Sequence, residues 1–274
     1  MTDLICHRIE SLNAFFNFLK YFDSPYFFFV LIPVIWLGIS YQWGVRIFYW
    51  YIINLFLNSW LKQMVGWPRP STDLPELAMF HPKSYGFPSN GAQTCMLLGA
   101  LLIYYWRTRA AWVIGSLYIL LISFSRLYLG VHYPIDILGG WAIGLALAAF
   151  FIYTKDPIEK YLAKRGALFG LILTLAIPGA LMLLIPTPKI YYNMGSIMGV
   201  GLGTYISLKC HLFLSPPQTI HQAAGRSFIA LFLLFLFIYL APAHTFANSF
   251  ITGLFMSLAA SPICKSLIAR KIIT

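Results

Sequence analysis

Long apolar runs separated by short polar segments make up most of this chain. Nine of the runs approach the roughly 20 residues that a helix needs to cross a bilayer. They fall near residues 24–41, 43–61, 92–106, 110–128, 134–153, 167–186, 190–208, 227–243 and 246–267. The eighth run is short for a span. Because tilt and short end segments are tolerated, the pattern predicts an all-α, polytopic membrane bundle of about nine transmembrane helices.

The N-terminal segment has a different pattern. Within residues 1–20, apolar side chains recur at helical spacing, which predicts a helix lying along the membrane interface. Asp3 and Glu10, together with the lack of a basic region before an apolar core, argue against a signal peptide. A frayed polar leader is the alternative interpretation of the same residues.

A charged stretch, 155–166 (KDPIEKYLAKRG), interrupts the apolar runs. It predicts a linker between a first part, residues 1–154, and a second membrane part of about four helices, residues 167–274. The second part has few ionisable residues inside its runs. It also has the small-xxx-small spacing of closely packed membrane helices, at Gly195, Gly199 and Gly203.

The composition supports a membrane protein, with 59% hydrophobic and 10% charged residues and a mean hydropathy of +0.75. In a nine-helix arrangement most Lys and Arg residues fall on the side of the 155–166 linker, which the positive-inside rule makes cytoplasmic. The net charge of +11 therefore reflects topology. No basic soluble module with base-reading groups is present, so a nucleic-acid partner is excluded. The cysteines form no CxxC pair and share no ligand spacing with histidines, so neither a disulfide framework nor a metal site is indicated.

Candidate chemistry is concentrated in residues 125–136, SRLYLGVHYPID. Arg126, His132 and Asp136 are ionisable groups flanked by long apolar runs, and such groups in a membrane protein are functional candidates by default. If a helix begins near Pro134, the Asp136 carboxylate can reach back to one ring nitrogen of His132 and fix its tautomer. The other nitrogen is then free to attack. Arg126 could hold an anion opposite it.

Two further segments are expected on the same outward face of the membrane. The polar segment 62–91 begins with KQMVGWPRP, in which Lys62 and Arg69 are separated by six residues, and a loop of this length is usually functional. It ends with YGFPSNGAQ, which opens the third apolar run. A helix N-terminus there would offer unpaired N–H groups to an anion, from Ser89, Asn90 and Gly91. The converging donors suit a phosphoryl group.

Taken in order, K-x6-RP, PSxx and SR-x5-H-x3-D resemble the motifs of the type 2 phosphatidic acid phosphatase superfamily, the membrane lipid phosphatases, over about residues 20–153. The stretches YFDSPYFFF, SYGFPS and YLGVHYPIDILGGW look like bacterial members related to dolichyl-diphosphatases. The resemblance implies a six-helix-type phosphatase core followed by the extra C-terminal helices. It implies a nucleophile, His132, that forms a phosphohistidine, oriented by Asp136, and no metal or other cofactor. It places Lys62, Arg69, Ser89 and Arg126 on the phosphate, to which the predicted helix start adds Asn90 and Gly91.

One position departs from the family pattern. The family usually has PSGH, whose histidine protonates the leaving group, but here the residues are Pro88-Ser89-Asn90-Gly91. General acid catalysis contributes about 10²–10⁴-fold, so its loss matters most for a basic alkoxide leaving group. A phosphate monoester, with a second pKa of ~6, can leave unprotonated. The change therefore favours a lipid diphosphate or an acid supplied from elsewhere, and His81 is the spare histidine of the same outer loop.

These observations predict a phosphohydrolase that acts on a lipid phosphate or diphosphate, such as undecaprenyl diphosphate, in the bacterial inner membrane with its site facing the periplasm. Its partners would be that substrate and the surrounding membrane lipids. Two alternatives remain open. The phosphohistidine could pass its phosphoryl group to a lipid or sugar hydroxyl, which would make the protein a phosphotransferase. The chain could also be an inactive lipid-binding or lipid-transport protein.

Overall fold

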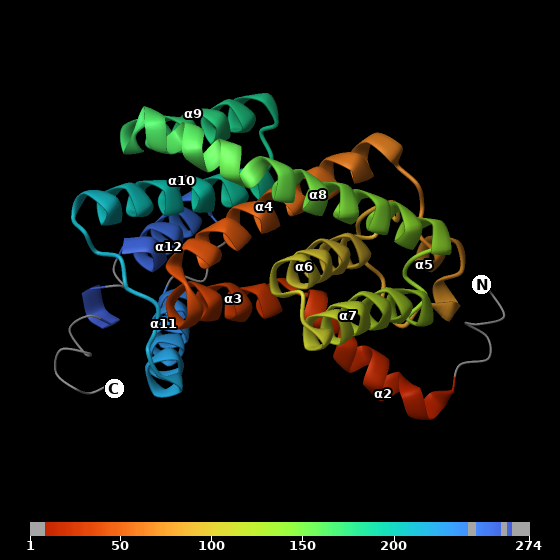
Figure 1. Ribbon diagram of the computed structural model, residues 1–274. Helices are drawn as coiled ribbons and strands as arrows, with labels where there is room; N and C mark the ends of the chain where they lie inside the picture. Colours follow the sequence, from red (N-terminus) through yellow and green to blue (C-terminus); the bar gives the residue numbers. More distant parts are fainter. Residues whose placement is uncertain (1–8, 241–244, 259–261, 265–274) are drawn as a thin grey trace. The chain divides into compact units, whose positions relative to one another are not determined.

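The structure is a computed structural model that describes residues 9–240, 245–258 and 262–264. Within these residues every regular element is a helix and there is no strand (Figure 1). The elements are α2 (Glu10–Leu19), η1 (Lys20–Asp23), α3 (Pro25–Pro33), η2 (Val34–Ile39), α4 (Tyr41–Val65), α5 (Pro70–Asp73), η3 (Pro75–Leu77), α6 (Asn90–Trp106), α7 (Arg109–Tyr128), α8 (Pro134–Arg165), α9 (Ala167–Leu184), α10 (Pro188–Lys209), α11 (Ile220–Leu240) and α12 (Phe246–Leu258). The predicted all-α fold is confirmed, and each of the nine apolar runs contains helix.

The number of helices that can span a membrane is smaller than nine. By length and composition, four segments of the described chain qualify, namely α7, α8, α9 and Phe246–Cys264. The pair Glu10–Asp23 and Pro25–Ile39, bent by 55°, adds a fifth if it counts as one span. The chain is thus an integral membrane protein with several apolar helices, and within its described residues fewer than the nine expected spans meet this criterion.

The physical reason is the polarity and length of the remaining helices. α6 has only 17 residues. α4 has polar residues along its length, Arg46, Asn54, Asn58 and Lys62, and α10 includes Lys189, Asn193 and Lys209. The eighth predicted run extends into residues 241–243 and the ninth into 259–261 and 265–267. These residues lie outside the described part, as do residues 1–8 of the predicted interfacial helix.

The chain forms two compact units, one of Met1–Phe28 and Ile53–Lys155 and the other of Phe29–Ile52 and Asp156–Thr274. One boundary lies at Lys155, where the predicted linker starts. The linker itself is helical, because α8 continues without a break to Arg165.

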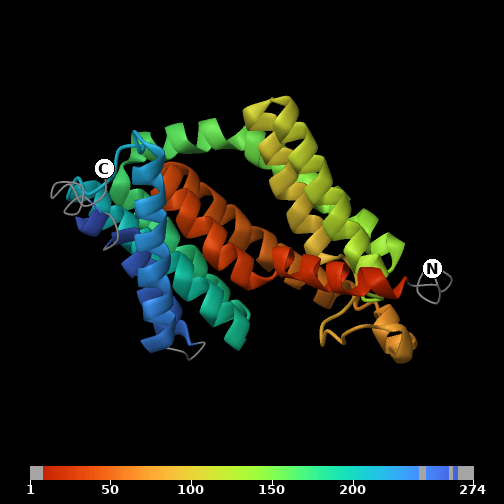
Figure 2. The ribbon, with the colours of Figure 1, turned by 90° about the horizontal axis from the view of Figure 1, so that it is seen from below.

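In the first unit, α6 and α7 lie side by side (Figure 2). Each has a side-chain cap, since Ser89 Oγ accepts the Ala92 N–H and Thr108 Oγ1 accepts the Ala111 N–H, as expected for N-cap residues. α8 crosses the start of α6 so closely that a side chain on Gly140 of α8 would have no space. A Cβ on Gly140 would lie 2.8 Å from the Ser89 carbonyl oxygen and 2.9 Å from Ala92 Cβ. This close crossing brings the first turns of α6 and α8 together.

The N-terminal segment packs onto α7 in the same unit. Phe16 and Tyr128 stack with ring centroids 4.1 Å apart, and the Tyr128 hydroxyl donates to Asn13 Oδ1 at 2.8 Å. The Tyr118 hydroxyl donates to the carbonyl oxygen of Phe22 at 3.0 Å. These contacts place η1, which ends at Asp23, at a defined position on α7.

In the second unit, α10 packs against α12 (Figure 1). A Cβ on Gly195 or Gly203 would lie within 2.9 Å of a backbone oxygen of α12. The predicted small-residue face of the helix at 188–209 is therefore a packing face, and the prediction of close helix contact there is confirmed.

Candidate active site

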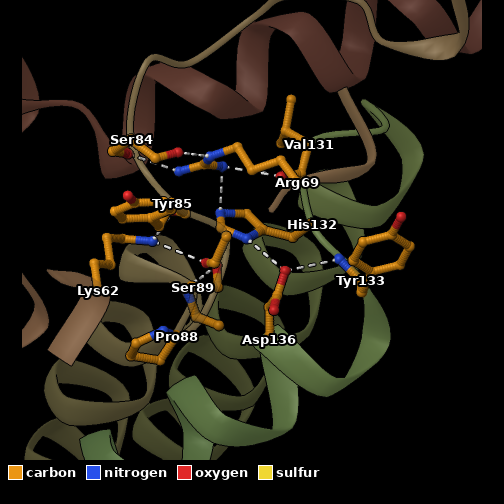
Figure 3. Close-up of polar contacts among 12 residues, drawn as sticks. Lys62, Arg69, Ser84, Tyr85, Pro88, Ser89, Val131, His132, Tyr133 and Asp136 are labelled. Atoms are coloured by element: carbon orange, nitrogen blue, oxygen red, sulfur yellow. Dashed lines mark hydrogen bonds and ion pairs between the residues drawn. The ribbon is translucent and has the colours of Figure 1, made fainter. Parts of the chain in front are cut away.

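The segment between α7 and α8 contains the histidine of the SRLYLGVHYPID stretch. α8 begins at Pro134, as the sequence predicts, with Asp136 in its first turn. Asp136 Oδ2 accepts the backbone N–H of Tyr133 at 2.9 Å, which is the reach-back contact of a capping box. The same oxygen lies 3.1 Å from Nδ1 of His132 (Figure 3). The local helix start therefore positions the carboxylate against the imidazole.

The contacts of His132 define its tautomer. Nη1 of Arg69 lies 3.0 Å from Nε2 of the imidazole, and a guanidinium has donors only. Nε2 must therefore accept, so the ring proton is on Nδ1 and is donated to Asp136. Nε2 keeps a lone pair, which is the form of an imidazole that can attack an electrophile.

The imidazole is also held neutral. Burial, followed by the positive charges of Arg69, Lys62 and Arg126, lowers the pKa of His132 well below its ordinary 6.5. The residue is only 4% exposed. Because a buried, cation-surrounded imidazole resists protonation, His132 is an unprotonated base at neutral pH.

This shift predicts a pH dependence of stability. The pKa of His132 is lower in the folded state than in the unfolded state, so below about pH 6.5 the unfolded chain binds the additional proton and stability falls. Between about pH 7.5 and 5.5 the loss is roughly 1.4 kcal/mol, which His132→Gln removes. Thermal unfolding in detergent at both pH values measures this loss of stability. His221→Gln, which replaces an exposed histidine, is the matched control. An equal pH dependence in wild type and His132→Gln would contradict the assignment.

Arg69 is fixed over the imidazole by several hydrogen bonds (Figure 3). Its Nε and Nη2 donate to the carbonyl oxygen and the hydroxyl of Ser84 at 2.6 and 3.0 Å. Nη1 also donates to the carbonyl oxygen of Val131 at 2.9 Å. Burial lowers the pKa of Arg69 to about 10, so the guanidinium remains a cation at neutral pH beside the nucleophilic nitrogen.

Lys62 and the start of α6 meet at the same place. Lys62 is buried, and its Nζ donates to the carbonyl oxygens of Tyr85 and Gly86 at 2.6 and 2.8 Å. The Ser89 N–H donates to the carbonyl oxygen of Asp136 at 3.0 Å. The three predicted motif segments therefore converge. The first-turn amides of α6, at Asn90 and Gly91, are those that a helix leaves without an intrahelical partner.

Arg126 lies beside Gly91 and forms an ion pair with Asp23, a residue outside the three motifs. Its Nη1 is 3.3 Å from Oδ1 of Asp23, and its Nε donates to Ser125 Oγ at 3.1 Å. Its Nη2 is buried with no hydrogen-bond partner among the described residues, as is Oδ1 of Asn90. A buried unsatisfied donor is costly, and an anionic ligand would satisfy the one on Arg126.

The charge balance of the cluster is positive. The buried cations are Lys62, Arg69 and Arg126, whose exposed fractions are 6%, 6% and 5%. The carboxylates facing them are Asp136 and Asp23. A buried charge is destabilising unless an opposite charge is close to it. A buried cluster with more cations than carboxylates therefore favours binding of an anion.

A buried polar network beneath the start of α6 was not foreseen from the sequence. Gln93 Nε2 donates to Asn54 Oδ1 at 2.9 Å, and Asn58 Nδ2 donates to Gln93 Oε1 at 2.8 Å and to the Pro88 carbonyl oxygen at 3.2 Å. Asn54 Nδ2 in turn donates to Thr94 Oγ1 at 2.8 Å. The network joins α4 to α6 and supports the Ser89 turn. Asn54 and Asn58, four residues apart within an apolar run, are the signal that could have revealed it.

His81 lies apart from these contacts. It is exposed, and its Nε2 is 3.0 Å from the carbonyl oxygen of Pro75 in the outer loop. Of the other predicted site residues, Lys62, Arg69, Ser89, His132 and Asp136 lie together in Figure 3, and Arg126 lies beside Gly91. Asp23 was missed. It is one of only eight acidic residues in the chain and stands directly before an apolar run, which is the signal that could have singled it out.

Comparison with known proteins agrees with the motifs. Residues 43–159 match the family model of the PAP2 superfamily. The chain is 27% identical over 162 residues to an undecaprenyl-diphosphatase from Sulfolobus acidocaldarius, covering 56% of this chain and 77% of that protein. It is 25% identical over 225 residues to a probable sphingosine-1-phosphate phosphatase from Dictyostelium discoideum, covering 75% of this chain but only 55% of that protein.

A solved structure is also similar, that of a transmembrane PAP2-type phosphatidylglycerolphosphate phosphatase from Bacillus subtilis. Its TM-score is 0.49 at 22% sequence identity, and the match covers 57% of this chain and 83% of that one. The match of residues 43–159 to the PAP2 superfamily model confirms the resemblance predicted from K-x6-RP, PSxx and SR-x5-H-x3-D.

Proposed function

We propose that this protein hydrolyses a lipid phosphate or diphosphate through a phosphohistidine on His132. The observation that carries the proposal is the unprotonated Nε2 of a buried imidazole, oriented by Asp136 and facing the guanidinium of Arg69. A nucleophile beside converging cations suits an electrophile whose oxygens carry negative charge, which is the phosphoryl group.

Binding would use donors that the cluster already presents. A phosphate oxygen replaces Nε2 as the acceptor of Arg69 Nη1, which exposes the lone pair for attack. Another oxygen accepts from Arg126 Nη2, the buried donor without a partner, and from the first-turn amides of α6. Lys62 adds positive charge close to His132.

The chemistry then has two steps. Nε2 of His132 attacks phosphorus, the P–N bond forms and the bond from phosphorus to the leaving oxygen breaks. The imidazole becomes cationic, and Asp136 stabilises it through the hydrogen bond from Nδ1. Water then attacks the phosphohistidine, the P–N bond breaks and phosphate is released.

The leading substrate candidate is a polyprenyl diphosphate such as undecaprenyl diphosphate. A diphosphate releases a phosphate monoester that needs little protonation, which suits a chain with Gly91 where the family has its acid histidine. The relative from Sulfolobus acidocaldarius carries the name undecaprenyl-diphosphatase. The basic residues of 155–165 lie at the end of α8 opposite to His132, and by the positive-inside rule this supports a site on the outer face of a bacterial inner membrane.

Phosphate release from a substrate panel tests the proposal. The purified protein is incubated in detergent with undecaprenyl diphosphate, phosphatidic acid and sphingosine 1-phosphate, and free phosphate is measured. We expect release from at least one lipid, lost in His132→Ala. Transfer of the phosphoryl group to an added lipid or sugar hydroxyl without free phosphate would indicate a phosphotransferase. Binding of the lipids without any turnover would indicate an inactive lipid-binding protein.

A further inference from the structure

The space beside Gly91 is occupied by a carboxylate. A Cβ built on Gly91 would overlap Oδ2 of Asp23, and it would lie 3.1 Å from Cγ of Asp23 and 3.5 Å from Cδ of Arg126. Any side chain at position 91 would therefore enter the volume that the Asp23 carboxyl group fills. This is the position at which the superfamily resemblance places the histidine that protonates the leaving group.

Asp23 is built into the site. Its side chain is only 12% exposed, and its Oδ1 lies 3.3 Å from Nη1 of Arg126. η1, which ends at Asp23, contacts both α6 and α7, and the hydrogen bond from the Tyr118 hydroxyl to Phe22 holds the preceding residue. Asp23 lies outside residues 43–159, which match the family model, so the family motifs do not point to it.

From this geometry we infer that Asp23 is the general acid of this chain and stands in for the histidine that Gly91 replaces. The inference rests on the proposed function. In the first step, the Asp23 carboxyl group gives its proton to the leaving oxygen as the bond from that oxygen to phosphorus breaks. In the second step, the Asp23 carboxylate takes a proton from the water that attacks the phosphohistidine, which restores the acid.

The bound phosphate itself supplies the reason for the proton on Asp23. When Arg126 turns its donors to the phosphate, the carboxylate loses part of its counter-charge and faces a second anion. Two negative groups at short range do not both remain ionised, so Asp23 holds a proton at the moment when the leaving oxygen needs one. A glycine at position 91 leaves the space for this carboxyl group.

The inference widens the substrate class. An enzyme without an acid would be restricted to leaving groups that depart unprotonated, such as the phosphate of a diphosphate. With Asp23 as acid, the same site also hydrolyses alkyl monophosphates, whose alkoxide leaving group is strongly basic. The substrates then include lipid phosphate monoesters as well as lipid diphosphates.

Leaving-group dependence separates an acid from a residue that only positions Arg126. Asp23→Asn keeps an oxygen for Arg126 but has no acidic proton. On phosphatidic acid we expect kcat to fall by at least about 10²-fold, the lower end of what general acid catalysis contributes. On 4-nitrophenyl phosphate, whose phenolate leaves without protonation, we expect the single-turnover rate of 4-nitrophenolate release, which reports the first step alone, to stay within about threefold. Glu10→Gln, an exposed acidic residue on α2, is the matched control.

A swap variant provides the second measurement. Gly91→His alone should lose activity, because the imidazole would collide with Asp23. Combined with Asp23→Ala it has space, and we expect the double variant to recover hydrolysis of phosphatidic acid about 10-fold or more over Asp23→Ala, a fraction of the contribution of a positioned acid. Retained single-turnover release of 4-nitrophenolate in Asp23→Asn shows that the variant is folded.

The outcomes are distinct. Equal losses on both monophosphates in Asp23→Asn, without recovery in the double variant, would overturn the inference and leave His132 catalysis standing. A wild type that hydrolyses diphosphates but no alkyl monophosphate overturns it as well. Leaving-group dependence in His81→Ala, and not in Asp23→Asn, would assign the acid to His81. Absence of any phosphate release that depends on His132 would overturn the proposed function and the inference together.

Discussion

Replacement of His132 by alanine is expected to abolish turnover on every substrate of the panel, with a loss of more than about 10⁴-fold. Nε2 is the nitrogen that attacks phosphorus, and neither Arg69 nor Asp136 can supply an equivalent nucleophile. Incubation with radiolabelled substrate followed by a rapid quench should leave label on the wild-type protein and none on His132→Ala. Steady-state phosphate release gives the size of the loss.

The loss has to come from chemistry and not from misfolding. His132→Ala should insert into membranes and elute from a sizing column in detergent as wild type does, because α8 still begins at Pro134. His221→Ala, a change at an exposed histidine in the second unit, should retain full activity. Activity of His132→Ala above a few per cent of wild type would contradict the assignment of His132 as the nucleophile.

Asp136→Asn is expected to have the second largest effect. The carboxylate accepts the Nδ1 proton of His132, so it holds the tautomer in which Nε2 is free and stabilises the cation that forms on attack. An asparagine amide can donate to Nδ1 and thereby move the ring proton to Nε2. We expect kcat to fall by about 10³–10⁴-fold, as is typical for an aspartate that orients a catalytic histidine.

Asp73→Asn is the matched control for that change. Asp73 Oδ2 accepts a hydrogen bond from the Tyr133 hydroxyl at 2.7 Å, and this bond is exposed. The bond is the main reason why the pKa of Tyr133 is raised to about 12. Its loss should leave kcat nearly unchanged. If both variants lose activity equally, the effect of Asp136→Asn comes from the helix start and not from the imidazole tautomer.

Much of the fold can be predicted from the pattern of apolar positions. Every predicted run contains helix, since runs of this length satisfy the backbone internally in an apolar environment. Among the described residues four or five segments meet the criteria for a span, fewer than predicted. In α4 one reason is that apolar length alone does not register Asn54 and Asn58, whose side chains form the buried network with Gln93. In a membrane protein, such polar side chains are tolerated when they bond one another.

The sequence by itself determined the local parts of the site. His132 and Asp136 are four residues apart across a Pro-initiated helix start, and that spacing is sufficient to bring the carboxylate to the ring. Ser89 caps α6 for the same local reason. These contacts arise within one or two turns of chain, where residue type and spacing decide the geometry.

Only the tertiary structure decided what surrounds these local elements. Arg69 meets Nε2 of His132 across 63 residues of sequence, and Asp23 fills the space beside Gly91 through the packing of η1 on α6 and α7. Neither contact is signalled in the sequence by a hydrophobic periodicity or by a helix-capping pattern. Gly91, which has no side chain, and the carboxylate of Asp23 are far apart in the sequence. They become neighbours only when the helices pack, because packing determines which side chain fills the space beside a given residue.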